Sequence, residues 1–273
     1  MNRPLASLAI NSTLLAAATL ALAPLLWMVS VSLMPTGASS TYPPPLLPSE
    51  PTLEHYRELL AQGQLGRQFA NSLGLACAMT LIATLFNTMA GYAFAKLRFA
   101  GRDRVFHTLL AALVIPGQVA MMPLFLMLKG MGLVNSYAGV LIPGVAGIFG
   151  IFLVRQYAKS VPDELLEAAR IDGAGEFRIF FGIVLPILTP VLVTLAVFTF
   201  LGSWNDFMWP LIVLTDSELQ TLPVAIASLS REHVQDGELM MAGAVVTVLP
   251  VLLLFLALQR YYMQGLLVGS VKQ

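Results

Sequence analysis

Long runs of apolar residues recur along the chain, and each is too long for a β-strand. There are six of them, each with about the 20 residues that a helix needs to cross the hydrocarbon core of a bilayer: residues 14–33, 69–94, 108–128, 134–154, 186–214 and 240–258. Asp206 is the only charged residue within them. Outer-membrane strands would span about 10 residues and alternate apolar with polar positions. The pattern therefore predicts an all-α integral membrane protein, a single domain over residues 1–273 with six transmembrane helices.

The charge distribution sets the expected orientation. Only 11% of the residues are charged and the mean hydropathy is +0.78, whereas about 25% are charged in a soluble domain. The net charge is zero, so no nucleic-acid partner is expected. With six spans, eleven Lys and Arg residues fall on the side that holds both termini and four on the other side. The positive-inside rule therefore places both termini in the cytoplasm.

The first run has two interpretations, a cleaved signal peptide or a retained helix. Arg3 precedes it and a stretch of small residues, "TGASS", follows it. A signal-peptide core holds about 7–15 apolar residues, and this run is longer. We therefore expect a transmembrane helix that stays in the mature protein.

Residues suited to catalysis or metal binding are sparse. The three histidines are scattered along the chain, with no second ligand at metal-binding spacing. No nucleophile–base pair, carboxylate pair or GxxxxGK[ST] phosphate loop is present. The single cysteine, Cys77, permits no intrachain disulfide and is expected to be a small packing residue. The sequence predicts no catalytic residue and no metal site, hence a protein that is not an enzyme.

Two outer loops, residues 34–68 and 215–239, separate the runs on the other side of the membrane. The first is rich in proline and then reads "PTLEHYRELL", a short amphipathic helix that Thr52 caps and whose common face holds Leu53, Tyr56, Leu59 and Leu60. This helix lies either on its own bundle or against a partner. Proline and glycine interrupt the third and fourth runs, at Pro116, Gly117, Pro123, Gly139, Pro143, Gly144, Gly147 and Gly150. We expect breaks in the helix of the third run and, in the fourth, a kink at Pro143 and close helix packing at the glycines.

Polar residues inside the apolar runs are candidates for a translocation pathway. The fifth run contains "SWNDF", and a carboxylate facing lipid is costly. Asp206 therefore faces a pathway, a neighbouring helix or the outer surface. The candidate set is Gln118, Trp204, Asn205 and Asp206.

A charged segment, residues 158–186, lies between the fourth and fifth runs and faces the cytoplasm in this topology. "SVPDELLEAARIDG" starts with Pro162, Asp163 and Glu164, which suit the first turn of a helix, and ends with Gly173, which suits a left-handed residue after its end. Eleven residues make a helix of about 16 Å. After a turn, "EFRIFFGIV" resumes a helix up to Pro186. A short cytoplasmic helix is therefore predicted between helices four and five.

This segment resembles the EAA motif of permease subunits in binding-protein-dependent ABC importers. Glu167-Ala168-Ala169 is followed after three residues by Gly173, and after nine more by Ile183-Val184-Leu185-Pro186. "GYAFAKLRFAGR", "WNDFMWPLIVL" and the terminal "LALQRYYMQGLLVGSVKQ" are similar to the maltose-type carbohydrate permeases, to the shorter, six-helix member of the pair. The family usually ends in "GAVKG" rather than the "GSVKQ" found here.

The resemblance implies the type I importer permease fold and a set of partners. These are a second homologous permease, a dimer of ATPase subunits that carries the ATP and Mg, an extracytoplasmic sugar-binding protein, a di- or oligosaccharide and membrane lipids. The expected location is a bacterial or archaeal cytoplasmic (inner) membrane. The residues implied to couple the permease to the ATPase are Glu167, Ala168, Ala169, Asp172, Gly173, Leu185 and Pro186. By position, Arg231, Glu232, His233 and Gln235 are candidates for contact with the binding protein, although the same loop also fits a plain connector.

Several alternatives remain at this point. The solute is a sugar or another compound, such as glycerol phosphate or a polyamine. An ATP-independent secondary transporter would also be polytopic, but it often shows internal repeats, and no convincing duplication is present. A membrane-embedded enzyme would need clustered polar residues, whereas Asp206 is the only charged residue in its run.

Overall fold

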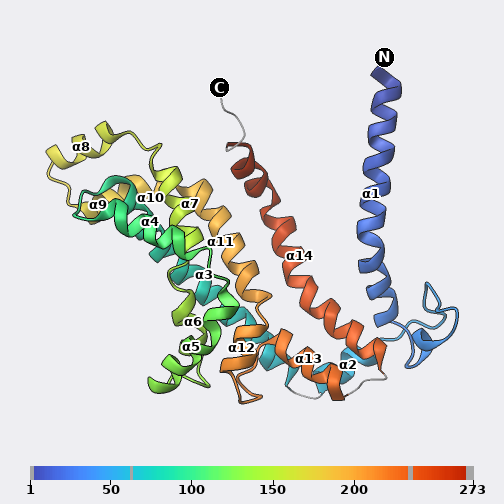
Figure 1. Ribbon diagram of the computed structural model, residues 1–273. Coiled ribbons are helices and arrows are strands. Elements are labelled where there is room, and N and C mark those ends of the chain that lie inside the picture. Colours follow the sequence, from blue (N-terminus) through green and yellow to red (C-terminus); the bar gives the residue numbers. More distant parts are fainter. Residues whose placement is uncertain (1–2, 62–63, 233–235, 269–273) are drawn as a thin grey trace. The chain divides into compact units, whose positions relative to one another are not determined.

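The computed structural model describes residues 3–61, 64–232 and 236–268, and all regular elements among them are helices (Figure 1). The α-helices are α1 (Arg3–Ser32), α2 (Glu54–Ala61), α3 (Leu65–Lys96), α4 (Arg102–Ala112), α5 (Gly117–Gly130), α6 (Tyr137–Leu141), α7 (Ile148–Ala158), α8 (Asp163–Ile171), α9 (Glu176–Ile179), α10 (Leu185–Ile187), α11 (Thr189–Trp204), α12 (Met208–Val213), α13 (Leu222–Glu232) and α14 (Gly237–Val268). Two short 3-10 helices, η1 (Ala38–Ser40) and η2 (Ile142–Gly144), and one π-helix, η3 (Phe180–Val184), complete the set.

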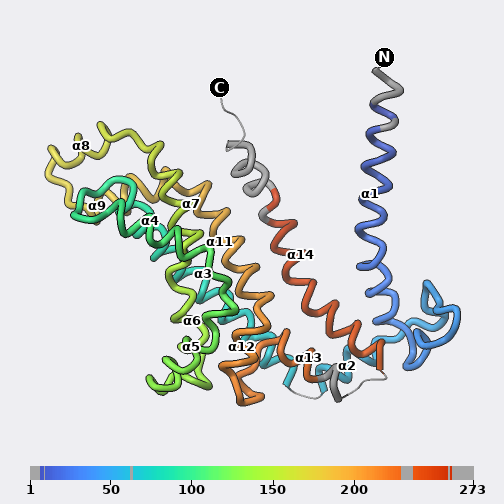
Figure 2. The backbone as a smooth tube through the Cα atoms, in the orientation of Figure 1, coloured from blue at the N-terminus to red at the C-terminus, as the bar shows by residue number. Residues whose placement is uncertain are grey.

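The chain forms two compact units. The first combines residues 1–67 with 225–252, and the second combines residues 68–224 with 253–273. Figure 2 traces the backbone of both. The second unit contains the charged segment, residues 158–186, and the predicted coupling and pathway residues.

Three helices among the described residues are long and apolar enough to cross a membrane unaided: Ile10–Ser32, Leu65–Lys96 and Gly237–Ala257. Three further spans are possible if each bent pair of helices counts as one. These pairs are α4 with α5, bent by 105°, α6–η2 with α7, bent by 41°, and the α9–α10 stretch with α11, bent by 82°. The total of up to six agrees with the six predicted runs.

The bends fall where the sequence places proline and glycine. α4 ends at Ala112 and α5 begins at Gly117, directly after Pro116, as predicted. Pro123 lies inside α5. The π-helix η3 ends directly before α10, which contains Pro186. Proline has no backbone N–H to donate, and the wider turn of a π-helix accommodates the break in the hydrogen-bond ladder.

The fifth run is shorter than predicted. The sequence predicted one continuous helix over residues 186–214, whereas α11 ends at Trp204 and a separate helix, α12, begins at Met208. Asn205 and Asp206 lie in the break between them. The expectation that Asp206 lies inside a helix is therefore wrong, because the chain turns at this position and frees backbone groups that a polar side chain can bond.

Glycine permits close packing of α3 on its neighbours within the second unit. A Cβ on Gly91 would lie 2.7 Å from Cβ of Val154 on α7, and one on Gly144 would lie 2.5 Å from Cε of Met79. A Cβ on Gly139 would collide with the backbone oxygen of Leu133, and one on Gly150 with the Asn87 amide. The predicted close approach is confirmed at Gly144 and Gly150. Gly139 is crowded mainly by the preceding turn at Leu133, and Gly147 has only an ordinary contact, 3.7 Å from the Asn87 amide nitrogen. Cys77, in contrast, is exposed on α3 and packs against no core cluster of the described chain.

The first unit holds the extended outer loop and α2. Thr52 accepts a hydrogen bond from the Glu54 amide at 3.1 Å, which confirms the predicted cap. The predicted face is right in part. Leu59 is buried and Tyr56 is half-buried, whereas Leu53 and Leu60 are exposed and His55 is buried instead. His55 is drawn inward because its Nε2 bonds the backbone oxygen of Met34 at 2.9 Å.

Candidate functional site

The charged segment folds as the sequence predicts, into a short helix closed by a left-handed glycine. Pro162 precedes α8, and Asp163 and Glu164 lie in its first turn, where their charge favours the positive end of the helix dipole. Gly173 has φ +81°. The amide of Ala174 bonds the oxygen of Ala169 at 2.9 Å, and that of Gly173 bonds the oxygen of Arg170 at 3.0 Å. This pair of bonds is the Schellman motif, which requires a residue without a Cβ penalty at Gly173.

One face of α8 is buried in the second unit. Leu166 is 1% exposed and belongs to a core cluster with Val154, Ile179 and Val184, and Ala169 packs against the same cluster. Ala169 therefore serves the inner face of the helix, where a larger side chain would displace α8 from the cluster.

The opposite face of α8 is open in this chain. Leu165, Ala168 and Ile171 recur every third residue, and the side chains of Leu165 and Ile171 are 41% and 86% exposed. Glu167 and Asp172 are also exposed. Of the two alanines in the motif, Ala168 is the one on the open face, flanked by carboxylates, and this face fits a partner with apolar and basic groups.

Lys96, the last residue of α3, contacts the start of this segment. Its Nζ donates to the backbone oxygen of Val161 at 2.5 Å and to Oδ1 of Asp163 at 2.7 Å, with a longer contact of 3.5 Å to the oxygen of Lys159. The Lys96 side chain is only 6% exposed. The ammonium holds the pKa of the Asp163 carboxyl below its ordinary value.

Tyr92, one turn earlier on α3, contacts the end of the segment. Its hydroxyl donates to Oε2 of Glu176 at 3.0 Å, and Oε1 of Glu176 accepts from Nε of Arg170 at 2.7 Å. This bond raises the pKa of the Arg170 guanidinium above its ordinary value. The Tyr92 ring also lies 5.6 Å from that of Phe180. Neither residue is among the sequence-predicted site residues, because their partners lie more than 60 positions further along the chain.

The last predicted coupling residues lie further along, beyond η3. Leu185 packs against the same core cluster as Leu166, and Pro186 is exposed in the short helix α10. The chain bends between α10 and α11, so these two residues connect the charged segment to the membrane-spanning part of the fifth run.

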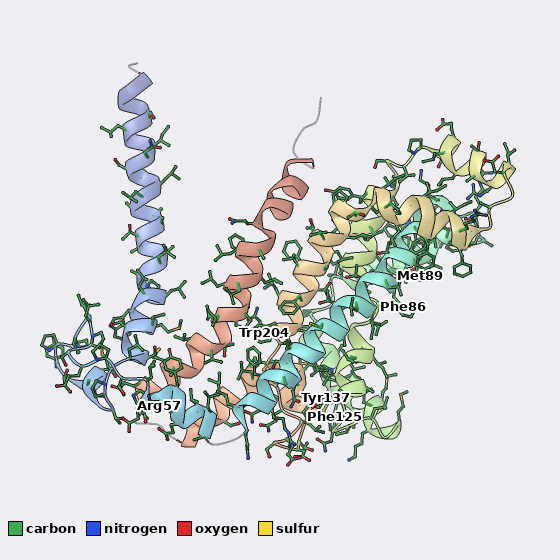
Figure 3. All side chains as sticks on the ribbon, turned by 180° about the vertical axis from the view of Figure 1, so that it is seen from behind. Arg57, Phe86, Met89, Phe125, Tyr137 and Trp204 are labelled. Carbon is green, nitrogen blue, oxygen red and sulfur yellow. The ribbon has the colours of Figure 1, made fainter. Side chains whose placement is uncertain are left out.

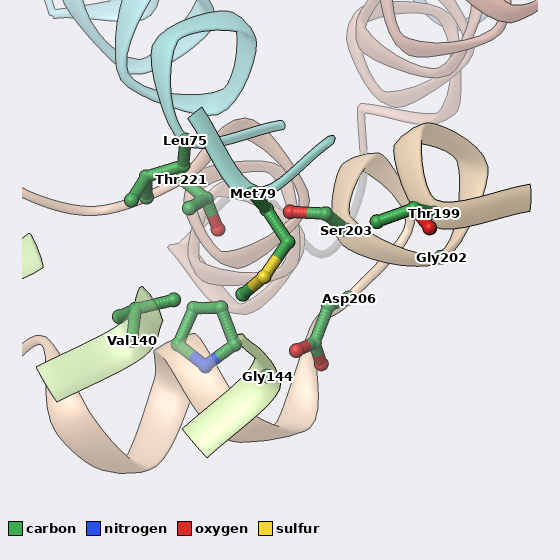
Figure 4. Close-up of a pocket in the computed structure, with 10 residues that line it drawn as sticks. Leu75, Met79, Val140, Gly144, Thr199, Gly202, Ser203, Asp206 and Thr221 are labelled. Atoms are coloured by element: carbon green, nitrogen blue, oxygen red, sulfur yellow. The ribbon is translucent and has the colours of Figure 1, made fainter. Parts of the chain in front are cut away.

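Asp206 lines a pocket of about 200 Å³ in the second unit (Figure 4). Thr199, Ser203 and Thr221 supply hydroxyl groups to its lining, and Met79 extends into it from α3. Oδ1 of Asp206 also accepts from the Trp209 amide at 3.3 Å, which holds the carboxylate at the start of α12. Hydroxyls beside a carboxylate suit a polar, hydroxylated ligand.

The other predicted pathway residues do not line this pocket. Trp204, which Figure 3 labels, is buried. The centroid of its ring lies 5.5 Å from that of the Phe69 ring and 5.9 Å from that of the Phe200 ring. Asn205 is exposed and donates to the oxygen of Leu201. Gln118 is exposed in the first turn of α5. Ser203 and Thr199 lie one and two turns before Asp206, and that helical spacing is the sequence signal that could have identified them.

The candidate residues for binding-protein contact are described only in part. Arg231 and Glu232 end α13, and their side chains are not among those described. His233 and Gln235 lie outside the described residues. Their assignment stays a prediction.

One histidine lies closer to other potential metal ligands than the sequence predicted. Ligand atoms of His55, Glu58 and Asp236 lie within 4.8 Å of one another. Nε2 of His55 is bonded to Met34, and Oδ1 of Asp236 accepts from the Leu239 amide at 2.9 Å, at the start of α14. Nδ1 of His55, in contrast, is buried and has no hydrogen-bond partner among the described residues.

The described residues form an all-helical scaffold with up to six apolar spans and an exposed charged helix, which is the architecture of a polytopic membrane protein. The model of the family "binding-protein-dependent transport system inner membrane component" matches residues 87–268, about two thirds of the chain. The chain belongs to this family of ABC importer permeases.

Curated relatives agree over most of the chain. The arabinooligosaccharides transport system permease protein AraQ of Halalkalibacterium halodurans is 38% identical over 89% of this chain and 86% of its own length. The lactose transport system permease protein LacG of Rhizobium radiobacter is 33% identical over 100% and 98%, respectively. The diacetylchitobiose uptake system permease protein NgcG of Streptomyces coelicolor is 34% identical over 92% and 82%.

The fold is similar to that of a solved importer. A chain of a bacterial ABC transporter involved in the import of the acidic polysaccharide alginate aligns with a TM-score of 0.84 at 23% identity, over 96% of this chain and 99% of that chain. A second structure, the alginate transporter in complex with an alginate pentasaccharide-bound periplasmic protein, aligns with a TM-score of 0.65 at 16% identity, over 90% and 91%. At these identities the similarity concerns the fold, which is the all-α permease fold that the sequence predicted.

Proposed function

We propose that the chain is one of two membrane subunits of an ATP-driven importer for a di- or oligosaccharide. An extracytoplasmic binding protein delivers the sugar, and a dimer of ATPase subunits, which carries ATP and Mg, drives its translocation. The open apolar face of α8 is the observation that carries the proposal, because a polar, solvated connector would not place Ile171 at 86% exposure. The sugar follows from the names of relatives such as AraQ, LacG and NgcG.

In this proposal α8 is the coupling helix. Leu165, Ala168 and Ile171 enter a groove of the ATPase, while Glu167 and Asp172 pair with basic groups at its rim. Gly173 sets the exit of the helix, and Leu185 and Pro186 transmit its movement into α11. Closure of the ATPase dimer then moves the helices and changes the side from which the pathway is open.

The proposed orientation has both termini and residues 158–186 in the cytoplasm. The outer loops 34–68 and 215–239 then face the binding protein, and the pocket beside Asp206 lies on the route of the sugar. The excess of Lys and Arg on one side of the six spans supports this orientation.

The test is uptake into vesicles that contain the permease together with the products of neighbouring genes. A panel of labelled oligosaccharides is offered with and without ATP and the binding protein. Uptake of one sugar that requires both components supports the proposal and names the solute. Uptake without ATP would mean a secondary transporter, and ATP-dependent uptake of glycerol phosphate or a polyamine alone would replace the sugar.

A variant ties this activity to α8. Glu167→Lys reverses a charge on the open face, so co-purification of the ATPase and uptake should both be lost while the permease still inserts in the membrane. Glu167→Asp, which keeps the charge at the same position, serves as the matched control and should retain both. Unchanged uptake by Glu167→Lys would remove this residue from the coupling contact.

A further inference from the structure

The coupling loop is attached to one turn of α3 at both of its ends. Tyr92 and Lys96 are four residues apart and so share a face of α3. Lys96 contacts the entry to α8, at Val161 and Asp163, and Tyr92 contacts the exit through Glu176 and Arg170. α8 therefore lies between two polar contacts that originate from a single helix.

The entry contact is more than a surface ion pair. Asp163 is 72% exposed, and such a pair alone adds little stability. The other acceptors of Lys96 are backbone oxygens directly after α7, where the negative end of the helix dipole favours a cation. One ammonium group with three donors thus joins the end of α3, the end of α7 and the start of α8.

The exit contact also joins more than two groups. Glu176 uses both carboxylate oxygens, since Oε1 accepts from Nε of Arg170 and Oε2 accepts from the hydroxyl of Tyr92. Arg170 is in the last turn of α8 and Glu176 begins α9. The bond therefore spans the Gly173 turn and ties it to a tyrosine that is only 3% exposed.

We propose that Lys96 and Tyr92 are positioning residues that make α3 a direct carrier of movement from the coupling helix. This inference rests on the proposed function of α8. When the ATPase displaces α8, the two contacts move the end of α3 with it, and α3 carries Met79 and Leu75 of the pocket that Asp206 lines. Without the contacts, α8 would still dock on the ATPase, but its movement would reach α3 only through the apolar packing around Leu166.

The experiment compares Lys96→Met and Tyr92→Phe in the assembled importer, reconstituted with its ATPase and binding protein. Three quantities are measured: ATPase co-purification, ATP hydrolysis, and sugar transported per ATP hydrolysed. For Lys96→Met we expect assembly and hydrolysis to persist, while sugar per ATP falls by about tenfold or more, since a charged hydrogen bond is lost. Tyr92→Phe keeps the ring and should lower the ratio by about threefold or more.

Matched variants separate positioning from general damage. Lys129→Met removes an exposed lysine of α5, and Thr108→Val removes an exposed hydroxyl of α4; both should leave the ratio unchanged. Lys96→Arg, which keeps the charge, should restore part of it. Should Lys96→Met fail to assemble, Tyr92→Phe decides alone.

The inference fails if sugar per ATP stays at the wild-type value in the assembled variants. It also fails if assembly, hydrolysis and transport all fall in parallel, because a merely structural role predicts that result. A wild-type importer that shows no ATP-dependent uptake would instead refute the proposed function.

Discussion

At the scale of single residues, the site depends on a few residues that each contribute one or two physical properties. Gly173 contributes its backbone angle, and Ala169 contributes its small volume. Asp206 combines two roles, since its carboxylate bonds the amide of Trp209 and also faces a pocket with hydroxyl groups. Each role can be tested by a substitution that removes one property and keeps the others.

The angle at Gly173 is tested by alanine. A Cβ at this glycine meets nothing within 4 Å, so Gly173→Ala costs only the left-handed conformation, about 1–2 kcal/mol. The equilibrium between the docking conformation and its alternatives should therefore shift against docking by about 5- to 30-fold. The dissociation constant of the ATPase complex should rise by up to the same factor, as a titration of the purified ATPase would show.

Gly175 supplies the control for that substitution. It is equally uncrowded, but its φ is −72°, an angle that alanine adopts without strain. Gly175→Ala should therefore bind the ATPase like the wild type. Equal affinity of the two variants would contradict a conformational role for Gly173.

The pathway role of Asp206 is tested by Asp206→Asn. The asparagine oxygen can still accept from the Trp209 amide, so only the charge is lost. If the carboxylate bonds the sugar, uptake should fall by about tenfold or more, the value of a charged hydrogen bond. Normal uptake with normal assembly would leave Asp206 as the cap of α12.

At the scale of helices, the sequence predicted those elements whose signals are local. The cap of α2, the ends of α8 and the break at Pro116 each follow from residues within about one turn. The break after Trp204 was missed because "WNDFMWPLIVL" is apolar enough to be taken for a continuing helix. Pro210 is compatible with the first turn of a new helix, which is its position in α12. The contacts of Lys96 were missed for a different reason: its acceptors lie more than 60 positions along the chain, and only the packing of α3 on α7 brings them together.

That packing depends on Gly91, and a second glycine of α3 provides a matched comparison. A Cβ on Gly91 would lie 2.9 Å from the backbone nitrogen of Arg155, which cannot move independently of α7. Gly91→Ala should therefore destabilise the protein by about 1–3 kcal/mol, as overpacking does. Gly74 is exposed with open space around it, so Gly74→Ala should be neutral or stabilise by up to about 1 kcal/mol. Apparent melting temperatures in one detergent compare the two, and similar values would contradict the close contact of α3 and α7.

At the scale of the whole molecule, the arrangement across the membrane decides what each exposed surface meets. If all six spans cross the membrane, as proposed, the termini and α8 lie on one side of it and the proline-rich loop on the other. Charge alone predicts which of the two sides is the cytoplasm, because helix lengths and bends do not define a direction. The distribution of Lys and Arg is a statistical guide to orientation, so a direct measurement is required.

Single cysteines provide that measurement, because Cys77 is the only cysteine in the chain and Cys77→Ala removes it. In this background, Tyr42→Cys and Ile171→Cys introduce thiols at positions that are 98% and 86% exposed. A membrane-impermeant maleimide added to intact cells should label the cysteine at position 42 and leave the one at position 171 unmodified; inside-out vesicles should reverse the result. Added ATPase should then protect position 171, since Ile171 lies on the open face of α8. Labelling of both cysteines from the same side would contradict the six-span arrangement, and labelling of position 171 that the ATPase leaves unchanged would exclude this face of α8 from the coupling contact.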